Sequence, residues 1–255
     1  MVTEDRVYAF GRTAIIELFE NMFLEDFQQE FECSWVDETI SWIPWDYIKE
    51  IQNTTLRHVS SNTLDGAFAA IEQLERFYRT KQVEASFAAG VDIGRKRTLT
   101  ECMVVGKSSK GTLPLRLMIS LEKTRFEDQK RVLAALMRRL PIDLMMVDEN
   151  GIGSQLAEDL STTFPERVVG AEFTSANKER WAVGARLKTE QALVPIPADR
   201  DLAYQIHSIK KKVTASKNNV FDTARNEKHH ADKFWSWALA IAAGARGGAS
   251  WIFVG

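Results

Sequence analysis

The chain has 255 residues, of which 45% are hydrophobic and 27% are charged, and its formal net charge is −2. This composition is typical of a globular protein with one large domain, or one domain plus an extension. Because the net charge is close to zero, any binding of nucleic acid must rest on local basic patches. Two cysteines in unrelated contexts, Cys33 and Cys102, exclude a disulfide framework and a cysteine zinc site.

The N-terminal sequence MVTEDRVYAF lacks the basic segment and apolar core of a signal peptide. No run of apolar residues approaches the roughly 18 that a transmembrane helix needs. We therefore expect a soluble intracellular protein.

The first third of the chain is predicted to be mainly helical. Apolar residues recur at three- and four-residue steps over residues 13–31, and a second helix is expected at about residues 64–78. No segment here predicts a strand clearly, although the residues before Pro44 can be extended. These patterns predict a mainly helical N-terminal extension over residues 1–85.

After this extension the pattern changes to strands. The apolar runs SFAAGVDIG, LTECMVVG and LPLRLMISL are separated by turn residues, and they predict a meander of three strands. An amphipathic helix follows, in which Thr124 and Glu127 have the spacing of a capping box. Pro141 is expected to end this helix.

The remaining chain alternates between strands and helices. A strand over residues 142–147 is followed by a helix, the strand ERVVGAEF and the helix SANKERWAVGARLKTEQAL. A hairpin is expected around Asn218 and Asn219, and the last helix is DKFWSWALA. This order predicts an α/β domain over residues 86–255, with a mixed β-sheet flanked by helices on both faces.

Three aspartates stand at special places in this expected domain. Asp92 ends the first strand, Asp148 ends the strand after Pro141, and Asp232 lies in the first turn of the last helix. Singly, each is explained as a turn residue or a helix-start residue. Sites in such sheets form at the carboxyl ends of strands, however, so the three positions together favour one shared site.

Carboxylates held close together repel one another, and a hard divalent cation relieves that repulsion. Ligation by acids alone favours Mg²⁺ or Mn²⁺ over zinc. Two such ions about 4 Å apart can activate a water molecule and stabilise the leaving oxygen of a phosphodiester. The three aspartates therefore predict a metal site for phosphodiester cleavage, with two ions expected.

Three motifs in this order resemble the nuclease domain of the large terminase subunit of tailed bacteriophages, a member of the ribonuclease H-like superfamily. They are GVDIGRKRTLT, MMVDENGIGSQLAEDL and HHADKFWSWALA. The resemblance implies a ribonuclease H-like fold and metal-dependent cutting of concatemeric phage DNA during genome packaging. It assigns both catalysis and metal binding to Asp92, Asp148 and Asp232.

The resemblance also implies partners and a location. The substrate would be double-stranded DNA, and the partners would be the ATPase domain, the portal and the small terminase subunit of a packaging motor, in the cytoplasm of the bacterial host. The segment DFQQEFECSWVDETISWIPWDYI is similar to the connection between ATPase and nuclease in that family. Ala231 stands where many relatives have a second acid, which bears on the second metal ion.

The ATPase motif itself is not predicted in this chain. The run VVGKSSKG contains Gly-Lys-Ser, but Glu101 stands where the phosphate loop requires its first glycine. The segment that follows predicts a strand instead of the helix whose N-terminus would hold the phosphates.

Further residues have two possible roles each. His229 and His230 are either exposed or capping groups, or auxiliary residues that position water or contact the phosphate. The basic runs are either solvated faces or DNA phosphate contacts. The residues of these runs are Arg95, Lys96, Arg97, Lys210, Lys211, Lys212 and Lys217.

Two other functions remain open at this point. The same fold and acids fit a junction resolvase or another ribonuclease H-like nuclease. A DNA-packaging module that binds DNA without cutting it would share the basic runs. The remaining acids Glu101, Glu149 and Asp159 are not expected to bind metal.

Overall fold

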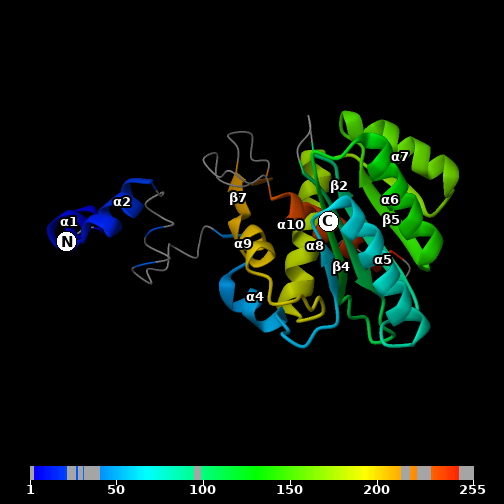
Figure 1. The fold of residues 1–255 in the computed structure, drawn as a ribbon, viewed down its shortest axis with the longest axis horizontal. Coiled ribbons are helices and arrows are strands. Elements are labelled where there is room, and N and C mark those ends of the chain that lie inside the picture. Colours follow the sequence, from blue (N-terminus) through cyan, green and yellow to red (C-terminus); the bar gives the residue numbers. More distant parts are fainter. Residues whose placement is uncertain are drawn as a thin grey trace. The chain divides into compact units, whose positions relative to one another are not determined.

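The computed structural model describes residues 3–21, 27, 31, 41–94, 99–213, 219–222 and 231–246. The chain divides into two compact units, Met1–Ser41 and Trp42–Gly255 (Figure 1). Helices α1 (Thr3–Phe10) and α2 (Thr13–Asn21) belong to the first unit. The helix expected over residues 13–31 is therefore described as far as Asn21, and most of its remainder lies outside the described residues.

A six-stranded sheet forms the centre of the second unit, with the strand order β1-β4-β3-β2-β5-β6. Its strands are β1 (Val59–Ser61), β2 (Phe87–Asp92), β3 (Leu99–Gly106), β4 (Leu115–Glu122), β5 (Ile142–Asp148) and β6 (Val168–Ala171). β2, β3 and β4 form an antiparallel meander, and β1, β5 and β6 join by parallel pairing. The predicted mixed sheet is confirmed.

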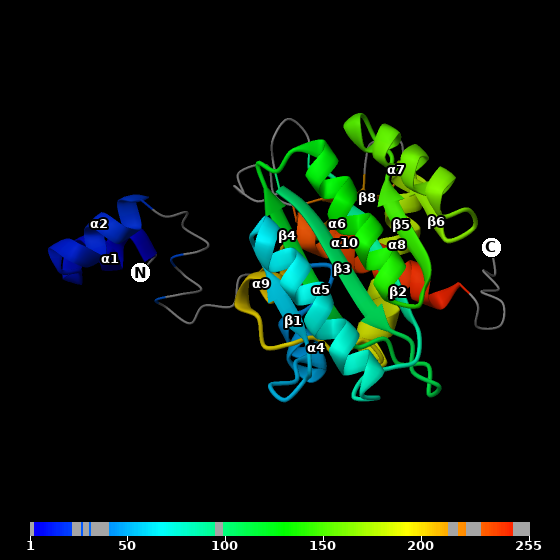
Figure 2. The same ribbon diagram turned by 45° about the vertical axis from the view of Figure 1, so that its right-hand side comes forward.

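Helices cover both faces of this sheet, as predicted (Figure 2). One face carries α5 (Leu64–Arg79), α6 (Phe126–Arg139) and α7 (Ile152–Thr163). The other face carries α4 (Trp45–Ile51), α8 (Ser175–Glu190), α9 (Arg200–Ser208) and α10 (Asp232–Ala245). Each face thus has its own hydrophobic core, because successive side chains of a strand point to opposite faces.

A separate two-stranded hairpin consists of β7 (Lys210–Val213) and β8 (Asn219–Asp222). It confirms the predicted hairpin, although Asn218 lies outside the described residues. None of the helices in the described part of the chain is both long and apolar enough to cross a membrane.

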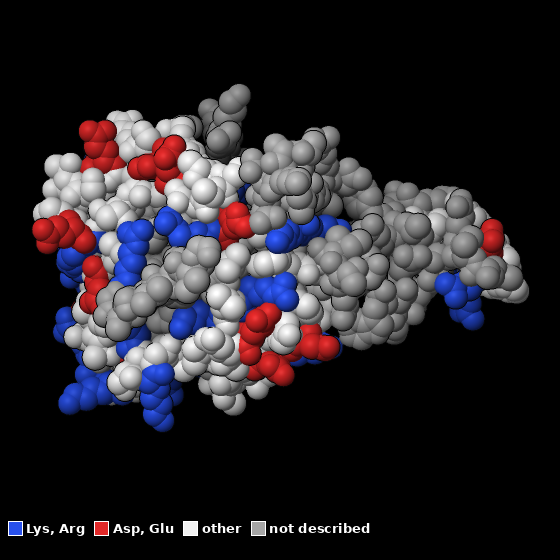
Figure 3. Space-filling model, turned by 180° about the vertical axis from the view of Figure 1, so that it is seen from behind, with Lys and Arg blue, Asp and Glu red and all other residues white. Residues whose placement is uncertain are grey.

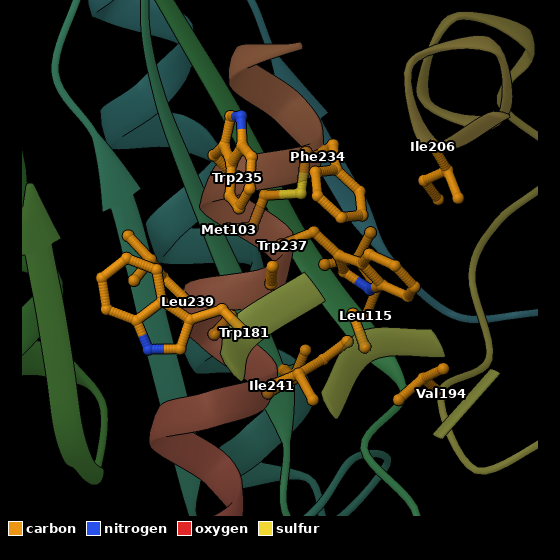
Figure 4. Close-up of a cluster of buried hydrophobic side chains, with 14 of the residues drawn as sticks. Met103, Leu115, Trp181, Val194, Ile206, Phe234, Trp235, Trp237, Leu239 and Ile241 are labelled. Carbon is orange, nitrogen blue, oxygen red and sulfur yellow. The ribbon is translucent and has the colours of Figure 1, made fainter. Parts of the chain in front are cut away.

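Helix α10 lies directly against the middle of the sheet. It packs on β2, β3 and β5, and on α8 and α9. Ten of its fourteen residues are buried, and Figure 4 shows Phe234, Trp235 and Trp237 of α10 among side chains from the sheet and the neighbouring helices. The Ser236 hydroxyl donates a hydrogen bond of 2.9 Å to the carbonyl oxygen of Gly90.

Two details differ from expectation. β1 was not predicted, because three residues are too few to show an alternating pattern. The capping box was wrong: α6 begins after Arg125 without a side-chain cap, and the Thr124 hydroxyl instead donates to the carbonyl of Glu122. Within the predicted extension 1–85, β1 is an edge strand of the sheet and α5 packs on the sheet. The similarity of this extension to the ATPase–nuclease connection stays a prediction.

Candidate active site

Four adjacent strands bring polar side chains into one line across the sheet. Asp92 on β2 pairs with Glu101 on β3, and Glu101 pairs with Ser120 on β4. On the other side of β2, Val91 pairs with Val147, so Asp148 lies beside Asp92 one residue further along both parallel strands. We call Asp148, Asp92 and Glu101 the acidic row.

The acidic row faces α10. Residues two positions away on the same strands point to the same face, and Met103, Met118 and Met146 all belong to the core under α10. Gly90, two residues before Asp92, lies directly beneath the α10 backbone. The sheet therefore presents three carboxyl groups to the helix that begins at Asp232.

Asp232 completes a group of four acids. The residue before it, Ala231, has a left-handed backbone (φ 54°), so the chain turns sharply into the first turn of α10. Asp232 and Asp148 both repel the charge of Asp92 strongly enough to raise its pKa. The structure thus brings together the three aspartates that the sequence singled out.

The electrostatics of this group favour a cation. Burial is the main cause that raises the pKa of Asp92 well above its usual value, and repulsion from Asp232 and Asp148 adds to it. Lys178 on α8 acts in the opposite direction. Asp92 and Asp148 are 8% and 7% exposed, so an edge of each remains open to solvent.

Glu101 is not expected from the sequence to bind metal, but it lies beside Asp92 at the β3 end of the acidic row. It is fully buried, and burial raises its pKa to about 8. The Ser120 hydroxyl lies 2.8 Å from both carboxylate oxygens and donates to them. No residue pattern in the sequence identifies Glu101, because only the register of β3 on β2 places it opposite Asp92.

Helix α9 holds the beginning of α10 in place. The Lys233 ammonium lies 2.6 Å from a carboxylate oxygen of Asp201, and the Lys233 backbone N–H donates to Gln205 over 2.9 Å. Gln205 is buried between the two helices. Because Lys233 follows Asp232 directly, these contacts also fix the backbone of Asp232.

The other predicted site residues lie either outside the described residues or in the β7–β8 hairpin. His229, His230, Lys217 and residues 95–97 lie outside the described residues. Lys210, Lys211 and Lys212 form most of β7, and the Lys211 ammonium lies 5.6 Å from the centre of the Trp42 ring. Figure 3 shows lysine and arginine side chains across the middle of one face, so this face carries local basic patches. Their contact with DNA stays a prediction.

The donor atoms suit a hard divalent cation, because all of them are carboxylate oxygens. Across the described ranges, however, no three Asp, Glu, His or Cys side chains are already arranged to hold a metal ion. Sharing a cation would therefore require these carboxylates to lie closer together than they do here. The chemistry of the residues therefore fits a metal, while their present arrangement is not a closed coordination shell.

Known proteins share this architecture. Residues 89–243, more than half of the chain, match the family model described as terminase RNaseH-like domain. This range includes Asp92, Asp148 and Asp232. No curated protein matches the chain.

Solved terminase structures share the fold at low sequence identity. The large terminase nuclease from thermophilic phage G20c with bound magnesium is 22% identical with a TM-score of 0.53, over 61% of this chain and 80% of that chain. A mutant nuclease domain of the large terminase subunit of bacterial virus Sf6 with manganese is 6% identical with a TM-score of 0.54, over 80% of this chain and 98% of that chain. The HK97 bacteriophage large terminase is 10% identical with a TM-score of 0.53, over 80% of this chain and 43% of that chain.

At these identities the solved structures show that the fold is shared, and the family model supplies both the RNaseH-like description and the sequence relationship. The chain belongs to the family of terminase RNaseH-like domains.

Proposed function

We propose that this chain is a Mg²⁺- or Mn²⁺-dependent DNA endonuclease that cuts concatemeric phage DNA during genome packaging. One observation carries the proposal: Asp92, Asp148 and Asp232 meet at one end of the sheet in a member of the terminase RNaseH-like family. The partners would be the ATPase domain, the portal and the small terminase subunit, in the cytoplasm of the host.

The three aspartates would bind one or two metal ions and form the catalytic centre. A bound divalent cation would activate water and stabilise the leaving oxygen of the phosphodiester. The fold positions these acids. The sheet holds Asp92 and Asp148 side by side, and contacts from α9 fix the start of α10 at Asp232. Burial and repulsion from the neighbouring aspartates disfavour the ionised form of Asp92, whereas the positive charge of Lys178 favours it.

The solved relatives support a metal-dependent reaction. The G20c nuclease was solved with bound magnesium and with bound cobalt, and the Sf6 nuclease domain with manganese. The basic residues of β7 and of residues 95–97 are the proposed DNA contacts, because phosphates next to an acidic site need compensating positive charge. His229 and His230 are proposed as auxiliary residues just before the catalytic helix.

Plasmid cleavage tests this function. We expect the wild type to cut supercoiled plasmid with Mn²⁺ or Mg²⁺, and to lose cutting in EDTA or on the Asp148→Asn substitution. Asp143→Asn is the matched control, because Asp143 lies near the other end of the same strand and pairs with Lys107 at the surface. It should cut like the wild type.

Four outcomes would contradict this proposal. Cutting that survives Asp148→Asn, or that persists in EDTA, would rule out the metal mechanism. DNA binding by the wild type without any cutting would identify a packaging module instead. A strong preference for four-way junctions over linear duplex would favour a junction resolvase.

A further inference from the structure

We propose that Lys178 is a phosphate-binding residue of this site, which contacts the DNA strand next to the acids. The inference deepens the proposed function and rests on it. Residue types alone do not indicate this role, because the run NKER is typical of a solvent-facing helical segment.

The fold brings Lys178 to the acidic row through β6 and α8. Ala171 at the end of β6 pairs with Asp148, so the chain leaves the sheet beside the row. The Thr174 hydroxyl caps α8 by accepting a hydrogen bond of 3.2 Å from the Asn177 backbone N–H. Lys178 follows in the fourth helical position, at the end of α8 that lies next to the acids.

The ammonium of Lys178 is held against α10. It lies 4.5 Å from the centre of the Trp235 ring, within the range of a cation–π interaction. Phe173 and Phe234 both pack against that ring in T-shaped contacts, with centroid distances of 5.8 and 5.0 Å. Figure 4 shows Trp235 beside Phe234 in the packed cluster around α10. The lysine is therefore positioned by a residue one helical turn after Asp232.

The position of this cation suits a phosphate. Its charge acts on Asp92, so it lies within electrostatic reach of the acidic row. Lys178 is only partly buried, so a bound strand can reach it from solvent. A lysine ammonium has three donors, and contact with a ring face leaves them available for phosphate oxygens. An acidic site that binds a polyanion needs such a fixed positive charge beside it.

Steady-state cleavage of a short duplex in Mn²⁺, measured at several salt concentrations, tests the role. For Lys178→Met we expect KM for DNA to rise roughly tenfold and its dependence on salt to weaken by about one phosphate contact. We expect kcat at saturating DNA and saturating Mn²⁺ to change little. Lys178→Arg should restore most of the loss. Lys188→Met, near the other end of the same helix, is the control and should behave like the wild type.

The outcomes separate this inference from the proposed function. If the wild type cuts and Lys178→Met has an unchanged KM and salt dependence, Lys178 does not bind phosphate. If Lys178→Met weakens Mn²⁺ binding but leaves KM unchanged, the lysine serves Asp92 alone and the inference is wrong. If the wild type itself does not cut under any of these conditions, the proposed function fails and the inference falls with it.

Discussion

Gly90 decides how closely α10 can lie on the sheet, and replacing it with alanine tests that packing. A Cβ atom at this position would lie 2.2 Å from the Ser236 carbonyl oxygen and 2.3 Å from the Ala240 nitrogen. Both are backbone atoms in the middle of a helix, so neither can rotate away. Relief requires that α10 move off β2 by about 1 Å, since ordinary contacts of this kind exceed roughly 3 Å.

The expected cost follows from two effects. Overpacking of a core typically costs about 1–3 kcal/mol. The same movement stretches the buried hydrogen bond from Ser236 to Gly90, which contributes about 1 kcal/mol. We therefore expect Gly90→Ala to lower the free energy of unfolding by about 2–4 kcal/mol. It should also weaken Mn²⁺ binding, because Asp232 moves away from Asp92 together with α10.

Gly184→Ala is the matched control. A Cβ at Gly184 in α8 would meet no atom within 4 Å, and alanine is favoured over glycine inside a helix by about 1 kcal/mol. The same substitution should thus have opposite signs at the two sites. Urea unfolding followed by tryptophan fluorescence measures both. A Gly90→Ala protein as stable as the wild type would refute the packing of α10 described above.

Two further predictions concern buried titrating groups. Burial lowers the pKa of His207 to about 4, so its contribution to stability is present above about pH 6.5 and is lost as pH falls toward 4. His207→Phe keeps the stacking on Trp45 but cannot take up a proton. Between pH 7 and 4 it should therefore lose less free energy of unfolding than the wild type, by at most about 3 kcal/mol. Equal losses in the two proteins would exclude a depressed pKa for His207. Burial raises the pKa of Glu101 to about 8, so its contribution is present below about pH 4.5 and is lost as pH rises through 8. In metal-free protein, Glu101→Gln should therefore gain stability relative to the wild type as pH rises from 5 to 8, by at most about 1.4 kcal/mol per pH unit. Unfolding curves with no such trend would contradict the buried position of Glu101.

Much of the fold was predictable because apolar residues recur in the sequence at spacings typical of strands and helices. The runs around β2 to β5 are apolar on both faces, which is typical of strands covered by helices on each side. Asp92, Asp148 and Asp232 were accessible from sequence because each stands at the end of a strand or the start of a helix.

The rest of the site depends on contacts that sequence patterns do not carry. Glu101 joins the acids only through the register of β3 on β2, which residue types alone do not fix. Lys178 in α8 contacts Trp235 in α10, and these two helices are distant in the chain. The capping box failed for a local reason: α6 starts at Phe126, so Thr124 lies one residue too early to cap it.

The central claim is that Asp92, Asp148 and Asp232 share a divalent cation. A crystal structure of the protein grown in Mn²⁺, with anomalous scattering recorded for manganese, tests it most directly. We expect an anomalous peak at coordination distance from carboxylate oxygens of all three residues, and its loss in Asp148→Asn. A folded protein in saturating Mn²⁺ that shows no peak among these aspartates, or that binds manganese elsewhere, would contradict a shared metal site.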